Sequence, residues 1–198
     1  MNIKKHRFTF FFALLLIGAN LLIANSIQAQ KHSHQDLVIH APESKKSPGG
    51  MIVGSISVKN MIAPIWGEYY CYLQKKDAPL SKKQKITIGV KLKNTSSKKF
   101  NPDTWDGDHS VYFFAVTLPA GEYELTEIAL VQKQKKNLKT ETLTLSSPVK
   151  VTAQKLTYIG EIRIDADSHM TGINDKQSRD VKAAQEKYKD ISWSSFTQ

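Results

Sequence analysis

The sequence predicts a mostly β protein, an antiparallel sandwich of seven or eight short strands with one amphipathic helix at its C-terminal end. Three observations favour this fold class. Apolar and polar residues alternate with a period of two over 49–59 and again over 86–92, which is the pattern of half-buried strands. Pro, Gly, Asn, Ser and Lys turns separate the apolar runs, and no helical repeat lies between them. A helical repeat occurs only after residue 174.

The predicted strands follow one another at short intervals along the chain. They cover residues 49–59, 68–74, 86–92, 111–118, 123–131, 140–145, 149–151 and 156–164. In the first of them Ile52, Ile56 and Val58 share one face. Within 123–131 the apolar positions change phase between Leu125 and Ile128, which predicts a β-bulge.

The predicted helix follows the last strand. Asn174 is a candidate N-cap, and Gln177 three residues later can reach back to it. An apolar stripe at helical spacing comprises Val181, Ala184, Tyr188 and Ile191. We expect this stripe to cover the protein's own sheet.

The stretch "LPAGEYEL", residues 118–125, predicts a corner between two strands. Pro119 fixes its own φ and Gly121 tolerates a positive φ, so the two supply a turn. Tyr123 comes two residues after the glycine, where sandwich domains use a tyrosine whose hydroxyl bonds backbone a few residues upstream. Nothing in the stretch is nucleophilic, so Pro119, Gly121 and Tyr123 are predicted to be structural.

The first 29 residues have the composition of a cleaved secretory signal. Lys4, Lys5 and Arg7 precede an almost continuous apolar run over 8–23, and Ala29 suits the position before a signal-peptidase cut. The run is short against the roughly 20 residues that span a bilayer. We therefore expect a periplasmic or secreted protein with a flexible polar linker at 30–48, a sandwich domain at 49–165, and a linker with the C-terminal helix at 166–198.

The net charge indicates which classes of partner the protein can bind, and the cysteine content limits its disulfides. The whole chain carries a net charge of +10; the leader holds three of its 28 Lys and Arg and none of its 18 Asp and Glu, which leaves +7. Export argues against nucleic acid and favours a protein or an anionic envelope component, reached through peripheral association with the membrane. Cys71 is the only cysteine, so no disulfide can form within the chain, and its aromatic surroundings predict a buried, inert thiol.

The segments "GSISV", "VYFFAVTLPAGEYELTEIAL" and "LTYIGEIRI", followed by the tail "DKQSRDVKAAQEKYKDI", resemble a recurring class of exported bacterial proteins and lipoproteins. The resemblance covers about Gly49 to Ile191. It implies an immunoglobulin-like (Greek-key) or transthyretin-like sandwich and no catalytic residues. Many members carry a lipobox cysteine, which this chain lacks. The shared motifs are structural ones, so they specify no function.

Two short motifs contain metal-ligand types. Asp165, Asp167 and His169 are spaced two apart, so on an extended chain all three would face one side and suit Zn²⁺ or Mn²⁺. The alternative, which the shortness of the motif favours, is a polar linker between the last strand and the helix. After cleavage the chain would begin at Gln30, and its amine, two amides and the imidazole of His32 could form a square-planar set for Cu(II) or Ni(II), assisted by His34. A polar leader without metal is the alternative.

The segment "NPDTWDGDHS" offers two weaker candidates. Asp103, Asp106 and Asp108 could collect Ca²⁺, but their spacing does not match the twelve-residue calcium loop. His109 lies between Asp108 and Ser110, and neighbours on an extended chain point to opposite faces, which disfavours a hydrolytic triad. A polar hairpin with an Asp-Gly turn explains these residues.

Together these features predict an exported protein that is not an enzyme and has no cofactor beyond a weakly bound divalent metal. It would act by binding or structural contact at the bacterial envelope. The alternatives are a metal-dependent hydrolase built on Asp165, Asp167 and His169, and a metal carrier that uses the histidine-containing leader.

Overall fold

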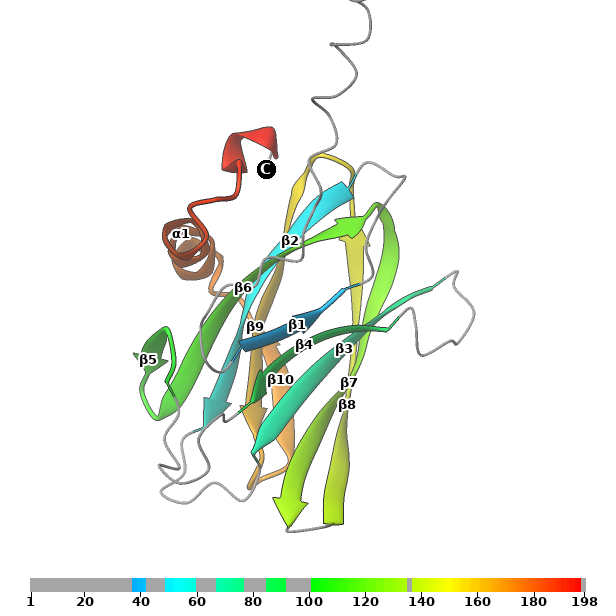
Figure 1. Ribbon diagram of the computed structural model, residues 1–198, viewed down its shortest axis with the longest axis vertical. Helices are drawn as coiled ribbons and strands as arrows, with labels where there is room; N and C mark the ends of the chain where they lie inside the picture. The colour runs from blue at the N-terminus through cyan, green and yellow to red at the C-terminus, as the bar shows by residue number, and fades with distance from the viewer. Residues whose placement is uncertain are drawn as a thin grey trace, which may run out of the picture.

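A computed structural model describes residues 37–41, 49–59, 67–76, 85–91, 101–134 and 137–196. Within these residues the chain forms ten strands and one α-helix, arranged as two five-stranded sheets with the helix on one side (Figure 1). The protein is therefore mostly β, as the sequence predicts.

The first sheet has the order β1-β4-β3-β7-β8. Its strands are β1 (Leu37–His40), β4 (Ile86–Lys91), β3 (Glu68–Lys75), β7 (Gly121–Gln134) and β8 (Asn137–Val151). Every neighbouring pair in this sheet is antiparallel. The pairing of β7 shifts register between Leu125 and Glu127, which confirms the predicted bulge.

The second sheet has the order β10-β9-β2-β6-β5. Its strands are β10 (Met170–Asn174), β9 (Leu156–Asp165), β2 (Gly49–Lys59), β6 (His109–Pro119) and β5 (Thr104–Asp106). β2 lies antiparallel to β6 and parallel to β9. The sandwich is thus mixed and not purely antiparallel.

One apolar core lies between the two sheets. Alternate residues of each strand point into it, as the period of two requires. Its fully buried members include Ile52, Ile56, Tyr112, Phe114 and Ile162 from the second sheet and Tyr69, Cys71, Leu73, Ile88 and Ile128 from the first.

Helix α1 (Gln177–Lys187) covers the outer face of the second sheet. Val181, Ala184 and Tyr188 are buried there against Met51 and Val53 of β2. A 3₁₀ turn, η2 (Trp193–Ser195), ends the described chain, and Trp193 packs against the same cluster. β2 is consequently buried on both faces, which its alternating sequence did not indicate.

The helix begins differently from the prediction. Asn174 ends β10, and Lys176 occupies the N-cap position without a side-chain hydrogen bond. Asp175 instead accepts a hydrogen bond from the backbone N–H of Gln177 at 3.0 Å. A carboxylate near the first turn also complements the helix dipole.

The strand number and two linker assignments were wrong. The predicted strands 140–145 and 149–151 are one strand, β8. β1 lies inside the expected linker 30–48 and pairs with β4, while β10 lies inside the expected linker after 165 and pairs with β9. β1, β10 and β5 are edge strands of four, five and three residues, so each offers little length in which a period-two pattern can be recognised.

The predicted corner is where the chain passes from the second sheet to the first. β6 ends at Pro119 and β7 begins at Gly121. The Tyr123 hydroxyl donates to the carbonyl oxygen of Pro119 at 2.8 Å, and the Tyr123 side chain is buried.

Candidate functional site

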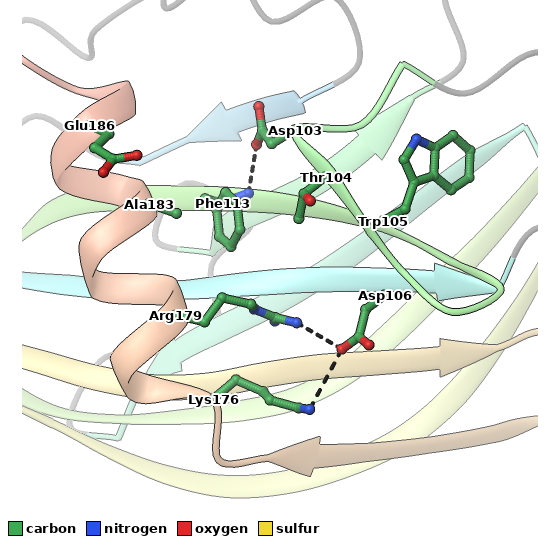
Figure 2. A pocket seen from close by; sticks show the side chains of 9 residues that line it. All are labelled: Asp103, Thr104, Trp105, Asp106, Phe113, Lys176, Arg179, Ala183 and Glu186. Carbon is green, nitrogen blue, oxygen red and sulfur yellow. Dashed lines mark hydrogen bonds and ion pairs between the residues drawn. The ribbon is translucent and has the colours of Figure 1, made fainter.

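An open depression lies between β5 and α1 (Figure 2). Its volume is about 560 Å³. It is lined by Asp103, Thr104, Trp105, Asp106, Phe113, Lys176, Arg179, Ala183 and Glu186. The sequence analysis treated Asp103 and Asp106 as turn residues and did not connect them with the helix, because the contact spans more than 70 positions.

Arg179, in the first turns of α1, is the centre of the depression. Its guanidinium donates to Asp106 at 2.8 Å, to Glu161 at 2.5 Å and, through Nε, to Asp180 at 2.8 Å. Glu161 and Asp180 are fully buried, whereas the Arg179 side chain keeps 29% of its surface exposed. One guanidinium thus joins the helix to β9 and β5, and buried carboxylates need such a partner.

Asp180 extends this network under the helix. Its Oδ2 accepts from the Ser55 hydroxyl at 2.7 Å and from the Tyr158 hydroxyl at 2.9 Å. The Tyr158 oxygen in turn accepts the backbone N–H of Lys176 at 2.9 Å. Burial and the nearby Asp180 raise the pKa of Tyr158, so this hydroxyl stays protonated at neutral pH.

A second buried pair fixes the other end of the helix. Lys187 donates to Asp103 at 2.6 Å and to the carbonyl oxygen of Phe113 at 2.8 Å, and both charged side chains are 7% exposed. The Tyr188 hydroxyl donates to the same carbonyl at 2.8 Å. Burial lowers the pKa of Lys187, although Asp103 acts in the opposite direction.

These contacts make the depression an attachment site for α1. Its basic groups are paired with internal carboxylates, and the hydroxyls of Ser55 and Tyr158 both donate to Asp180. The exposed indole of Trp105 points away from α1, on the opposite side of β5 from Asp106 (Figure 2). The arrangement therefore clamps the helix onto the second sheet.

The structure separates the three residues of the "DADSH" motif. The Asp165 carboxylate accepts a hydrogen bond from Lys59 Nζ at 2.9 Å. It also accepts hydrogen bonds from the backbone N–H groups of Asp167 and Ser168, at 3.2 and 3.3 Å. Burial alone would raise the pKa of Asp165, but the hydrogen bonds from Lys59 and Ser168 hold it below its usual value. His169 has a positive φ in the β9–β10 turn, and its Nε2 lies 3.0 Å from Glu141 of β8.

No group of three or more His, Cys, Asp or Glu side chains within the described residues is placed to hold a metal ion. Asp165 thus organises the β9–β10 turn, and the chain does not stay extended as a shared metal face would require. Gln30, His32 and His34 lie outside the described residues.

The "DGDHS" segment forms the β5–β6 hairpin, with Gly107 at φ +60. His109 Nδ1 lies 2.6 Å from Asp108, but the His109 side chain is only 2% exposed, and Ser110 points to the other face of β6. The three acidic candidates for calcium do not converge either. Asp103 contacts Lys187, Asp106 contacts Arg179, and Asp108 contacts His109.

Cys71 lies in the core on the inner side of β3. Burial raises the pKa of its thiol. The thiolate that would react is therefore disfavoured in the folded protein.

Two further surfaces combine residues from neighbouring strands. The first is the outer face of the first sheet, where Tyr70 and Tyr72 lie opposite the inward-pointing Tyr69, Cys71 and Leu73. No described helix or strand packs on this face. Two tyrosines at alternating positions beside buried neighbours were the available signal.

The second surface is the basic end, defined as Lys75, Lys76, Lys150 and Lys155. The backbone N–H of Lys76 donates to the Glu122 carbonyl oxygen, and Glu122 pairs with Lys150 across β7 and β8. Lys155 lies in the adjacent β8–β9 turn. Among the described residues no acidic side chain lies within ion-pair distance of these four lysines. Glu122 is their acidic neighbour in the strand register, so the described part of this end carries excess positive charge.

Comparisons with known proteins give little further constraint. No protein-family model matches the chain, and no curated protein matches it. A solved structure of a leucine-rich repeat protein from Bacteroides thetaiotaomicron is similar at a TM-score of 0.34 and 15% identity, over 60% of this chain and 14% of that one. The chain therefore spans about one seventh of that protein's length. Among the described residues no helix is long and apolar enough to cross a membrane.

Proposed function

We propose that the protein is exported, that it is not an enzyme, and that it binds anionic components of the bacterial envelope through the basic end. The secretory pattern of residues 1–29 supports export, with a mature chain that starts near Gln30 in the periplasm or outside the cell. The proposal needs no cofactor. It assigns the ion network beneath α1 to the stability of the fold.

The observation that carries the proposal is the unpaired charge of the basic end. Lys76, Lys150 and Lys155 are exposed, and Lys75 is half-buried beside the corner. By contrast, Lys59, Lys85, Lys91, Lys139, Lys176 and Lys187 each lie within ion-pair distance of an acidic side chain. Each lysine close to an anionic membrane contributes about 1 kcal/mol, so four together would hold the protein peripherally without a lipid anchor.

A metal-dependent hydrolase is the weaker candidate. Asp165 is occupied by Lys59 and two backbone N–H groups, and His169 faces Glu141. For these residues to bind one metal ion, the hydrogen bonds that form the β9–β10 turn would first have to break. No observation favours this alternative over contact binding.

We also infer a fold relationship. The sheets of an immunoglobulin constant-type sandwich, ABED and CFG, comprise seven strands. Here the described chain has two sheets of five strands, and β2 and β9 pair in parallel near the centre of one of them. These differences argue against the constant-type immunoglobulin arrangement and leave the transthyretin-like sandwich as the other fold that the resemblance implies.

Cosedimentation with lipid vesicles tests the proposed function. The protein should sediment with phosphatidylcholine vesicles that contain phosphatidylglycerol and should remain in solution with phosphatidylcholine alone. The bound fraction should fall when salt rises from about 0.1 M to about 1 M, because the Debye length shrinks from about 10 Å to about 3 Å. The double variant Lys76→Glu/Lys155→Glu should lose binding.

A matched control is Lys182→Glu/Lys189→Glu, which makes the same change in net charge at exposed positions on and just after α1. It should keep most of the binding. Equal loss in both double variants would show that only net charge matters, and a wild-type protein that ignores anionic vesicles would disprove the proposal.

A further inference from the structure

The outer face of the first sheet has a regular composition across its strands. The cross-strand registers place Val38, Gly89, Tyr70, Ala129 and Thr142 in one row, so a single large side chain stands among small ones. The next row contains His40, Thr87, Tyr72, Glu127 and Thr144. Tyr70 is therefore the one large side chain in this row; it is half-buried, and its neighbours Gly89 and Ala129 are buried.

The ring of Tyr70 lies down on the sheet because its neighbour on β4 is a glycine. A Cβ atom on Gly89 would stand 2.4 Å from Cδ1 and 3.0 Å from Cε1 of Tyr70. The same Cβ atom would stand 2.7 Å from the backbone oxygen of Tyr69, so a side chain at 89 would disturb both the ring and the backbone of β3. One face of the ring thus rests on the backbone of β4.

The hydroxyl of Tyr70 holds the ring in this position. It donates to Glu68 Oε2 at 2.5 Å, and the other oxygen of Glu68 lies 3.3 Å from Lys91 Nζ. Burial and this hydrogen bond raise the pKa of Tyr70. The ring is therefore fixed before any ligand arrives, which reduces the entropy lost on binding.

The ring of Tyr72, unlike that of Tyr70, is covered by a lysine. Lys85 Nζ lies 3.6 Å from the centroid of the Tyr72 ring and 2.6 Å from Glu127. A cation therefore occupies the Tyr72 ring face. Among the described residues no cation lies over Tyr70.

We propose that Tyr70 is the stacking surface of a binding site for a neutral glycan, with the polar groups around it as hydrogen-bond partners. The proposal rests on the proposed function of contact at the envelope and names a second ligand for the same protein. A sugar ring has an apolar C–H face that matches a flat, half-buried aromatic ring, and its hydroxyls match carboxylate, ammonium and hydroxyl neighbours.

Charge on this face supports a neutral ligand. Lys85 and Lys91 are balanced by Glu127 and Glu68 at ion-pair distance. Exposed Thr142 and Thr144 continue the polar surface onto β8. An anionic lipid surface would find no net attraction here, in contrast to the basic end, and an open flat face suits a chain of sugars better than an enclosed pocket would.

Titration of the purified full chain with chitohexaose and cellohexaose, followed by calorimetry, tests the inference. At least one of these neutral oligosaccharides should bind, and binding should persist at about 1 M salt because it is not Coulombic. Tyr70→Ala should weaken binding roughly tenfold or more, while Tyr72→Ala, whose ring is already covered by Lys85, should change it by less than about threefold. Thermal unfolding of each variant checks that it is folded.

The outcomes separate this inference from the proposed function. Lys76→Glu/Lys155→Glu should lose vesicle binding and retain oligosaccharide binding, and Tyr70→Ala should do the reverse. No binding of either oligosaccharide by the wild-type protein, or equal binding by a folded Tyr70→Ala variant, overturns the glycan site whatever the vesicles show. Loss of the same size in Tyr70→Ala and Tyr72→Ala also overturns it, because stacking on Tyr70 predicts a difference.

Discussion

The hydroxyl of Tyr123 spans the corner at which the chain changes sheets. It reaches the carbonyl oxygen of Pro119, four residues upstream, from a side chain that is 2% exposed. This contact could be predicted because it is local: a turn residue, a glycine and a tyrosine within five positions determine it. The position of Tyr70 depends on Glu68, two residues upstream, and also on Gly89, which lies on another strand.

Replacement of Tyr123 by Phe should therefore destabilise the protein without changing its surface. The change leaves the Pro119 carbonyl without its donor, and we expect a loss of about 1–3 kcal/mol in the free energy of unfolding, toward the lower value because Pro119 is half-buried. Urea denaturation measures this loss. Tyr72→Phe is the matched control, because no hydrogen bond from that hydroxyl is present among the described residues. Equal midpoints for the two variants would exclude a stabilising corner bond.

At the scale of elements, Arg179 decides how α1 is held. Hydrophobic contacts of Val181, Ala184 and Tyr188 cover the second sheet. Glu161 and Asp180, however, bring two carboxylates into the same interface with no exposed surface. The guanidinium is what makes their burial tolerable, since an uncompensated buried charge is strongly unfavourable.

Arg179→Met should accordingly cost about 3 kcal/mol or more of stability, because it leaves Glu161 and Asp180 without their cation. The exposed change Lys182→Met on the same helix should stay within about 0.5 kcal/mol. Chemical denaturation gives both values, and protease cleavage within α1 shows whether the helix itself detaches. If the two variants are equally stable, the packing of the apolar stripe alone holds the helix.

The elements also show what could be predicted and what could not. Strands with two neighbours have the period-two pattern and were found, as was the bulge near Leu125, because each signal lies within one segment. β1, β5 and β10 were missed because segments of four, three and five residues are too short to show a clear period-two pattern. The parallel pairing of β2 with β9 and the Arg179–Asp106 contact join distant segments, and no local pattern encodes them. The same reason explains why Asp165 and His169, close in sequence, have different partners.

On the scale of the whole molecule, several buried groups keep their protons up to a higher pH than they would in the unfolded chain. Burial raises the pKa of Tyr69, Tyr158 and Tyr188 in the folded protein, and it does the same for the thiol of Cys71. These groups keep their protons in the folded state at pH values at which the unfolded chain has released them. Lys187 acts in the opposite direction, because burial lowers its pKa.

The free energy of unfolding should therefore be highest below about pH 9 and fall at higher pH. The unfolded state loses protons first, near 9.0 for Cys71 and near 10.0 for the tyrosines, so it binds fewer protons than the folded state and stability decreases as pH rises. Each such group contributes a slope of up to about 1.4 kcal/mol per pH unit, and Lys187, which acts in the opposite direction, cannot cancel several of them.

Urea midpoints between about pH 8 and about pH 11 measure the decline in stability. Cys71→Ala should remove the part that begins near 9.0, and Tyr188→Phe should reduce the slope above 10.0. A midpoint that stays level across this range, or slopes unchanged in both variants, would mean that the buried hydroxyls and the thiol ionise as readily in the folded protein as in the unfolded chain.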